Sequence, residues 1–203
     1  MNQDPQPMRR ERSTAQRRET IVLAALHCFV EKGFHQASMR DIATQAGVSV
    51  GNVYNHFADK DALIAEIAAL EMQELHPLLE ALEHAEPLEG LLRFAKRYAA
   101  ICMQPDNVML TSEVIAEAAR NPALAALFAK NHAVLVTVLS RTLTRGMDVG
   151  ALDATLPPSA TAALMLDAIE GHALRAALFA PKTAALKRAN EDLATLLRKL
   201  LTQ

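Results

Sequence analysis

The chain has 203 residues, of which 51% are hydrophobic and only 4% aromatic, and its net charge at pH 7 is −2. This length can bury a substantial core, and it accommodates one large domain or a small domain joined to a larger one. The sequence contains no run of about 18 apolar residues and does not begin with a signal peptide. Its richness in Ala and Leu predicts an all-α protein, which we expect to be cytoplasmic and without a membrane span.

The charge is unevenly distributed along the chain. Residues 1–60 hold eight Lys and Arg against six Asp and Glu, whereas the rest of the chain holds 13 against 17. The amino-terminal part is therefore basic and the rest of the chain acidic, which favours contact of the amino-terminal part with nucleic acid. Residues 1–13 are polar and unpatterned, and they predict a disordered basic arm. We expect Arg17 and Arg18 beside it to contact phosphates, while a tail that only aids solubility is the alternative for the arm.

An amphipathic helix is predicted from Ser13 to Lys32. Ile21, Ala25 and Phe29 recur at i, i+4 and i+8 and form one apolar face. Gly33 follows at the place where a helix often ends in a left-handed residue, a conformation without steric cost for glycine.

A short helix is predicted to begin after Ser38. Ser38 and Asp41 have the spacing of a capping box. Gly47 is placed to end this helix, and Ser49 can cap a second short helix directly afterwards. The stretch therefore predicts two helices joined by a tight turn.

The second of these helices has two different faces. Val53 and Phe57 are four residues apart and would anchor it to a core. The opposite face is rich in hydrogen-bonding groups and consists of Val50, Gly51, Asn52, Tyr54, Asn55 and His56. A helix–turn–helix with such a face can place side chains in the major groove of DNA. The alternative is an ordinary helical hairpin whose polar face only meets water.

From Arg17 to Leu63 the chain resembles the DNA-binding domain of TetR-family transcriptional regulators. The resemblance is carried by Ile21, Ala25, Phe29, Gly33, Phe34, Ile42, Ala43, Ala46, Gly47, Val48, Ser49, Gly51, Tyr54, Phe57, Lys60 and Leu63. It implies a three-helix DNA-binding domain, which we place at residues 14–62, and a larger helical ligand-binding and dimerisation domain at residues 63–203. It also implies about nine helices in total, and double-stranded DNA as the partner.

The resemblance and the residue types together suggest roles at the DNA. In the resembled family, the residues that match Lys60 and Tyr54 contact the DNA backbone. Asn52 and Asn55 could pair with base edges, and Val50 could touch a thymine methyl group. The set predicted to face DNA is Arg17, Arg18, Arg40, Ser49, Val50, Gly51, Asn52, Tyr54, Asn55, His56 and Lys60.

The last two predicted helices, residues 159–180 and 183–201, form the expected dimer interface. One side of the first carries Leu164, Ala168, Gly171, Arg175 and Leu178, and the second carries Ala189, Leu193, Leu196, Leu197 and Leu200. A mid-helix glycine costs about 1 kcal/mol relative to Ala, which close approach of another helix would explain. TetR-like proteins dimerise through these helices, and two-fold symmetry matches a palindromic operator. The alternative is a pair of helices that only completes a monomeric core.

The middle of the chain contains candidates for a small-molecule pocket. They are apolar, sulfur-containing and aromatic residues with isolated polar side chains among them: Phe94, Tyr98, Cys102, Met103, Met109, Phe128, His132, Met165, Ile169 and His172. Met and aromatic side chains adapt to apolar ligands, while a lone His or Tyr orients them. A place in an ordinary core is the alternative for each single residue.

No pattern in the sequence indicates an enzyme. There is no HExxH, no GxSxG and no glycine-rich phosphate loop, and neither cysteine has metal-site spacing, so no cofactor or resident metal is expected. The sequence predicts a homodimeric, small-molecule-responsive repressor that binds a palindromic operator through residues 49–57. The alternative is a metal- or redox-responsive regulator of the same fold. Metal sensing would require Cys102 to lie close to His132 or His172.

Overall fold

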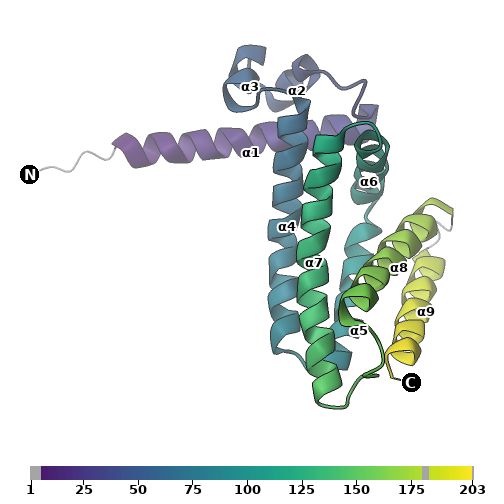
Figure 1. The fold of residues 1–203 in the computed structure, drawn as a ribbon. Helices are drawn as coiled ribbons and strands as arrows, with labels where there is room; N and C mark the ends of the chain where they lie inside the picture. The colour runs from purple at the N-terminus through teal and green to yellow at the C-terminus, as the bar shows by residue number, and fades with distance from the viewer. Residues whose placement is uncertain (1–5, 180–182, 203) are drawn as a thin grey trace, which may run out of the picture. The chain divides into compact units, whose positions relative to one another are not determined.

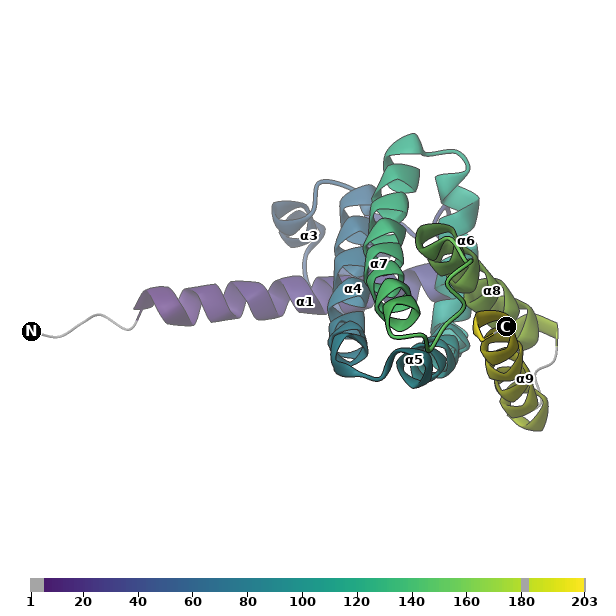
Figure 2. The ribbon, with the colours of Figure 1, turned by 60° about the horizontal axis from the view of Figure 1, so that its bottom comes forward.

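The computed structural model describes residues 6–179 and 183–202, and the side chains of residues 14–179 and 191–202. These described residues form nine α-helices and no strand (Figures 1 and 2), which confirms the predicted fold class. The helices are α1 (Gln6–Lys32), α2 (Met39–Ala46), α3 (Val50–His56), α4 (Lys60–His84), α5 (Pro87–Cys102), α6 (Pro105–Ala118), α7 (Pro122–Asp148), α8 (Pro158–Phe179) and α9 (Thr183–Leu201). Proline opens four of them, where its missing N–H has no helical partner to lose.

Helix α1 begins earlier than the sequence pattern predicted. It starts at Gln6, so residues 6–13 of the expected disordered arm are helical, and residues 1–5 lie outside the described part. This stretch is rich in Arg, Glu and Gln, which have high helix propensity even where no apolar face is present. Local propensity therefore extends the helix beyond the residues that pack against a core.

The chain divides into two compact units. The first, here called the head, comprises residues 1–71 and 112–124, and the second, the body, comprises residues 72–111 and 125–203. The division in α4 lies nine residues beyond the domain boundary expected at residue 62. The second half of α6 also groups with the head, which no sequence pattern indicated.

The head has a small apolar core shared by α1, α2, α3 and the start of α4. Its most deeply enclosed side chains are Ile21, Ala25, Phe29, Ile42, Val53, Phe57 and Leu63. These are the periodic residues of the predicted helices, and α2 packs against both α1 and α3. The core of the head therefore fixes which faces of α2 and α3 point outward.

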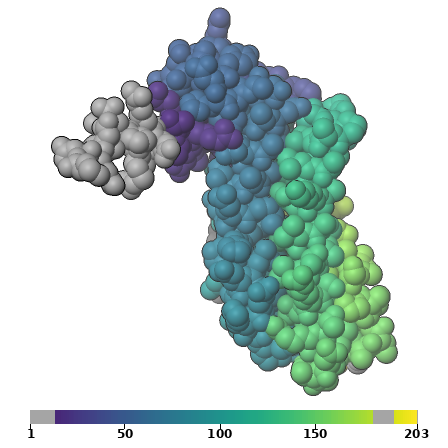
Figure 3. All heavy atoms as spheres, turned by 60° about the vertical axis from the view of Figure 1, so that its left-hand side comes forward, coloured from purple at the N-terminus to yellow at the C-terminus, as the bar shows by residue number. Residues whose placement is uncertain are grey.

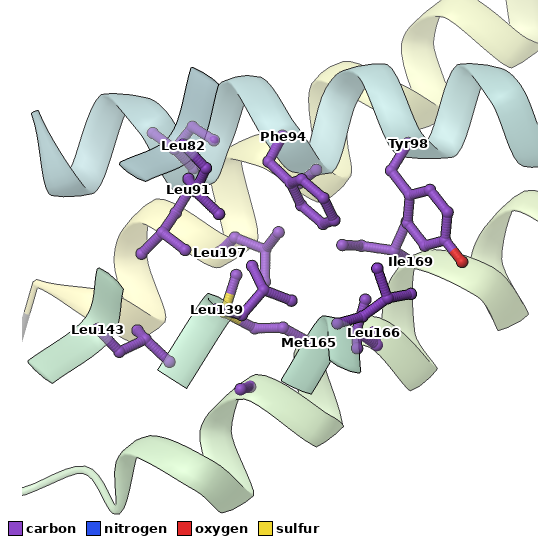
Figure 4. Packing of buried hydrophobic residues seen from close by; sticks show 14 of the residues in the cluster. Leu82, Leu91, Phe94, Tyr98, Leu139, Leu143, Met165, Leu166, Ile169 and Leu197 are labelled. Carbon is purple, nitrogen blue, oxygen red and sulfur yellow. The ribbon is translucent and has the colours of Figure 1, made fainter. Parts of the chain in front are cut away.

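The core of the body is built from α5, α7, α8, α9 and the second half of α4. Helix α5 packs against α8 and α9, and Figure 4 shows Phe94 and Tyr98 of α5 above Met165, Leu166 and Ile169 of α8. The rings of Phe94 and Tyr98 stack with centroids 5.4 Å apart. The second half of α4 and α7 lie side by side in the body (Figures 1 and 3) and contribute rows of leucines to the same cluster.

Helix α4 continues through Pro77 and ends at His84. Its carboxyl end is held by the guanidinium of Arg145, which donates to the main-chain oxygens of Leu82 and Ala85 at 3.0 Å each, and also to that of Glu83. The last carbonyls of a helix have no partner within the helix, and a cation there also favours the helix dipole.

Helix α7 is the one described helix that is long and apolar enough to cross a membrane by length and composition alone. Its most apolar 18-residue window has a mean hydropathy of 1.5. A single such helix is weak support for a membrane span, because helices of helical soluble domains pass the same test.

Candidate nucleic-acid interface

Helix α2 starts with the capping box that the sequence predicted. Ser38 Oγ accepts the Asp41 N–H at 3.1 Å, and Asp41 Oδ2 accepts the Ser38 N–H at 2.9 Å. Asp41 Oδ1 also lies 2.6 Å from Lys32 Nζ at the end of α1. The hydrogen bonds from Lys32 and Ser38 hold the pKa of Asp41 well below its usual range. This carboxylate therefore joins the end of α1 to the start of α2.

The turn between α2 and α3 depends on Gly47. Its φ of 66° lies in the left-handed region, and its N–H donates to the carbonyls of Ala43 and Thr44. The Val48 N–H donates to Ala43 as well, at 3.0 Å. A Cβ at Gly47 would meet no atom within 4 Å, so the backbone conformation alone explains the glycine.

Helix α3 is fixed at both ends. At its start, Ser49 Oγ accepts the Asn52 N–H at 3.2 Å, as predicted for the cap. At its end, the Phe57 N–H donates to the Val53 oxygen at 2.9 Å, and the Phe57 ring enters the head core. The buried Val53 side chain anchors the middle of the helix.

The opposite face of α3 points to solvent and carries most of the residues predicted to face DNA. Tyr54 is 53% exposed, and Ser49, Gly51 and Asn55 are also exposed. A Cβ built on Gly51 would meet no atom within 4 Å. The remaining members of this face, Val50, Asn52 and His56, are half-buried.

Asn52 differs from Asn55 in its surroundings. The Oδ1 atom of Asn52 is buried and has no hydrogen-bond partner among the described residues. Asn55, one turn later, has an exposed side chain. Direct base contact is therefore easier for Asn55, a difference that helical spacing alone did not reveal.

Lys60, predicted to contact phosphate, bonds to the protein in this structure. Its Nζ donates to the main-chain oxygens of Phe34 at 2.5 Å and His35 at 3.3 Å, and lies 4.5 Å from the centroid of the Phe34 ring. The start of α4 is capped next to it, because Asp59 Oδ1 accepts the Ala62 N–H at 2.8 Å. Lys60 thus ties the start of α4 to the loop between α1 and α2.

The three arginines predicted to contact DNA lie in two kinds of environment. Arg17 on α1 and Arg40 on α2 are exposed. Arg18 instead bonds to both carboxylate oxygens of Glu66 in α4, at 3.0 and 2.7 Å. The sequence offered no signal for this pair, because 48 residues separate its members.

Carboxylates of α6 hold the loop between α1 and α2 in the head. Glu113 Oε2 accepts the Phe34 N–H at 2.8 Å. One turn later, Glu117 Oε2 lies 2.9 Å from His35 Nε2, and Arg120 is 3.3 Å from the same nitrogen. These contacts join residues about 80 positions apart, so no local sequence pattern indicates them.

The residues predicted to form a small-molecule pocket all lie in the body, but in different environments. Phe94, Tyr98, Met165 and Ile169 are part of the packed core. The half-buried members are Cys102, Met103, Phe128, His132 and His172, and Met109 is exposed.

A polar pair lies at the edge of that core. The Tyr98 hydroxyl donates to Glu170 Oε1 at 2.7 Å, and Figure 4 shows this hydroxyl pointing away from the apolar cluster. Burial and the nearby carboxylate raise the pKa of Tyr98 above its usual range, so the hydroxyl stays a donor at neutral pH. The Nε2 atoms of His132 and His172 are buried without a hydrogen-bond partner among the described residues, and Asp167 lies 3.9 Å from that of His132.

No group of three or more His, Cys, Asp or Glu among the described residues could hold a metal ion. Cys28 and Cys102 form no disulfide with another described residue, and burial raises the pKa of Cys28.

Family models match both parts of the chain. The model for bacterial regulatory proteins of the tetR family matches residues 21–67, and the model for the C-terminal domain of AefR-like transcriptional repressors matches residues 89–196. The HTH-type transcriptional regulator UidR of Escherichia coli (strain K12) is 29% identical over 158 residues, which cover 76% of this chain and 78% of UidR. The HTH-type transcriptional repressor AcnR of Corynebacterium glutamicum is 24% identical over 140 residues, which cover 69% of this chain and 71% of AcnR.

Solved structures share the fold over almost the whole chain. Salmonella enterica GusR has a TM-score of 0.76 at 24% identity and covers 100% of both chains. FadR from Bacillus subtilis, in complex with stearoyl-CoA, has a TM-score of 0.79 at 21% identity, covering 90% of this chain and 98% of its own.

Proposed function

The chain belongs to the TetR family of transcriptional regulators and is a DNA-binding repressor, and on this premise we propose that it binds a palindromic operator as a homodimer and is released by a small molecule. The observation that carries the proposal is the exposed polar face of α3, which is fixed at both ends by Ser49 and Phe57. The protein regulates transcription in the cytoplasm and is not an enzyme.

Two copies of α3 enter successive major grooves, about 34–36 Å apart on one face of the operator. The exposed Asn55 amide pairs with a base edge, and Asn52 contributes after a change of rotamer. Tyr54 and the exposed Arg17 and Arg40 hold phosphates and set the register. Ser49, Val50, Gly51 and His56 complete the DNA-facing surface of α3. Lys60 and Arg18, which were also predicted to contact DNA, bond to the protein in this structure.

An electrophoretic mobility shift with the DNA upstream of the protein's own gene tests the DNA contact. We expect the double variant Tyr54→Ala, Asn55→Ala to bind at least tenfold more weakly, because phosphate and base contacts are lost together. Gln73→Ala is a matched control, since it truncates an exposed amide in the body. Undiminished binding by the double variant would show that this face of α3 does not read DNA.

The homodimer rests on an exposed apolar face of the last two helices. Phe179 is 76% exposed and Leu164 67% exposed on α8, and Leu178 of α8 and Leu196 and Leu200 of α9 are also exposed. An apolar surface of this kind marks an interaction site in a soluble protein. Leu193 and Leu197 lie in the core of the body instead, and Ala189 lies outside the described side chains.

The molar mass in solution tests the dimer. We expect Leu196→Glu to shift the protein from dimer to monomer in light scattering, because it places a charge in the apolar interface. Ile115→Glu is the matched control, since Ile115 is an equally exposed apolar residue of the head. A wild type that is monomeric at micromolar concentration would contradict the proposal.

The body is the proposed site for the small molecule. The apolar core next to the Tyr98–Glu170 pair, and the two unpartnered His nitrogens, would suit a ligand with a long apolar part and a polar end. Since FadR from Bacillus subtilis was solved with stearoyl-CoA, this acyl-CoA is the first probe. A ligand weakens DNA binding only to the extent that it binds the DNA-free conformation more tightly than the DNA-bound one.

A thermal-shift titration tests the ligand. We expect stearoyl-CoA to raise the melting temperature and weaken operator binding, and free CoA to do neither. Absence of stabilisation by acyl compounds of any chain length would reject this ligand class while leaving DNA binding intact. Neither the described residues nor the relatives add support for the metal- or redox-responsive alternative, which DNA release by a chelator or by peroxide would favour.

A further inference from the structure

Arg18 makes four contacts within the head, all of them with residues from later in the chain. Its Nε and one terminal nitrogen donate to the two carboxylate oxygens of Glu66 at 3.0 and 2.7 Å. The other terminal nitrogen donates to the main-chain oxygen of His56 at 3.2 Å. The guanidinium carbon lies 4.3 Å from the centroid of the Phe57 ring. One side chain thus joins α1, α4 and the end of α3.

The contact with His56 matters because His56 is the last residue of α3. The final carbonyls of a helix have no partner within the helix, and a cation there also favours the helix dipole. Helix α3 has only seven residues, far fewer than an isolated helix needs to be stable in water. Its direction must therefore be set by tertiary contacts, namely the packing of the buried Val53 and the groups that hold its two ends.

Glu66 keeps the guanidinium in place. Its two oxygens match the fork of the Arg side chain, a geometry that a lysine could not reproduce. The ion pair lowers the pKa of Glu66, so the carboxylate stays charged at neutral pH. Three of the five N–H groups of Arg18 are engaged, and the ring of Phe57 covers one face of the guanidinium.

We propose that Arg18 and Glu66 are positioning residues for DNA recognition: together they hold the carboxyl end of α3 at the angle at which its exposed face meets the major groove. Arg18 then acts on DNA binding through α3, and not as a phosphate contact. The inference rests on the proposed DNA contact of α3.

The salt dependence of operator binding separates the two roles of Arg18. The slope of log K against log salt is negative, and removing a phosphate contact lowers its magnitude by about one. We expect Arg18→Ala to weaken binding about tenfold between roughly 50 and 200 mM salt with an unchanged slope. Arg17→Ala is the matched control, because it removes the neighbouring exposed arginine. We expect it to lower the magnitude of the slope.

The variant Glu66→Gln separates the two roles of Arg18 independently, because they predict opposite changes in operator affinity. If Arg18 positions α3, loss of the ion pair weakens operator binding severalfold. If Arg18 contacts phosphate, loss of a negative charge and release of the guanidinium strengthen binding. Glu19→Gln controls for the change in net charge, and we expect it to leave binding unchanged or slightly stronger.

Hydrogen exchange in the free protein tests the pair without DNA. We expect the amides at the end of α3 to exchange faster in Glu66→Gln and in Arg18→Lys than in the wild type or in Arg17→Lys. If the wild type did not bind the upstream DNA, the proposed operator would be rejected. The exchange rates would still show whether Arg18 and Glu66 hold the end of α3. Three outcomes would each overturn the positioning role. They are an unchanged exchange rate in Glu66→Gln and Arg18→Lys, a salt slope of smaller magnitude in Arg18→Ala, and tighter operator binding by Glu66→Gln.

Discussion

Glu113 of α6 accepts the main-chain N–H of Phe34 at 2.8 Å, although 79 residues separate the two. A Cβ on the neighbouring Gly33 would lie 3.1 to 3.3 Å from the same carboxylate, and the φ of Gly33 is 78°. The left-handed backbone favours glycine at this position, and a Cβ there would also crowd the Glu113 carboxylate. The loop that leads from α1 into the helix–turn–helix is therefore held by the part of α6 that belongs to the head.

Glu113→Ala should loosen this loop. Phe34 is almost fully buried, and its N–H would lose a hydrogen bond to a charged acceptor, which costs about 2 kcal/mol. We expect faster hydrogen exchange at residues 33–37 and a lower unfolding temperature of the head. Glu74→Ala truncates an exposed Glu within α4 and should change stability by less than about 0.5 kcal/mol. Equal effects of both variants would show that the hydrogen bond does not stabilise the head.

Gly51→Ala should separate folding from DNA binding. The site is exposed and a Cβ would meet nothing within 4 Å, so the folded head tolerates alanine and gains up to about 1 kcal/mol from helix propensity. On the operator, the added methyl group would stand between α3 and the DNA. We expect an unchanged or raised unfolding temperature together with weaker operator binding. Operator affinity equal to that of the wild type would show that DNA does not approach this residue closely.

Gly171→Leu should act on the dimer in the same selective way. A Cβ at this exposed position of α8 would meet no atom of its own chain within 4 Å. Within one chain a leucine is therefore tolerated, and only a second chain packed closely against α8 would exclude it. We expect sedimentation to show a weaker dimer while the helix content in circular dichroism is retained. A dimer as tight as the wild type would place the interface elsewhere.

Acid should destabilise the head through Asp41 and Glu66. Hydrogen bonds from Lys32 and Ser38 lower the pKa of Asp41, and the ion pair with Arg18 lowers that of Glu66. Both pKa values are lower in the folded than in the unfolded state, so the stabilisation is complete above the unfolded values near 4. It is lost as the pH falls through the lower, folded values.

Thermal unfolding between about pH 6 and pH 3 checks this dependence. We expect the melting temperature of the head to fall towards pH 3, and to fall less in Glu66→Gln, which has already lost the ion pair at neutral pH. If the melting temperature fell equally with pH in the wild type and in Glu66→Gln, the Arg18–Glu66 pair would contribute nothing to acid sensitivity.

Both ends of α2 and the start of α3 could be predicted because short-range interactions set them. Ser38 and Asp41 form the expected capping box, and Gly47 and Ser49 form the expected turn and cap. Each of these features depends on residues three or four positions apart, so one stretch of chain contains all the information. The same holds for the core faces, where Ile21, Ala25 and Phe29 are buried as their spacing predicted.

The partners of the charged residues could not be predicted in this way. Arg18 and Lys60 have the charge expected of phosphate contacts, and nothing in their own segments distinguishes them from the exposed Arg17. Their partners lie far away in sequence, at Glu66 and in the loop at Phe34. The burial of the Asn52 oxygen likewise follows from the packing of α3 on its neighbours and not from helical period.

The sequence by itself determined that this protein is helical, that its amino end carries a helix–turn–helix, and which face of α3 is polar, because backbone preference and side-chain periodicity act over a few residues. Only the tertiary structure decided which of the cations predicted to contact DNA remain exposed and which bond to other groups of the head. Ion pairs and hydrogen bonds to carbonyls form wherever folding brings a donor and an acceptor within about 3 Å. Local sequence patterns contain no information about which distant residues meet in this way.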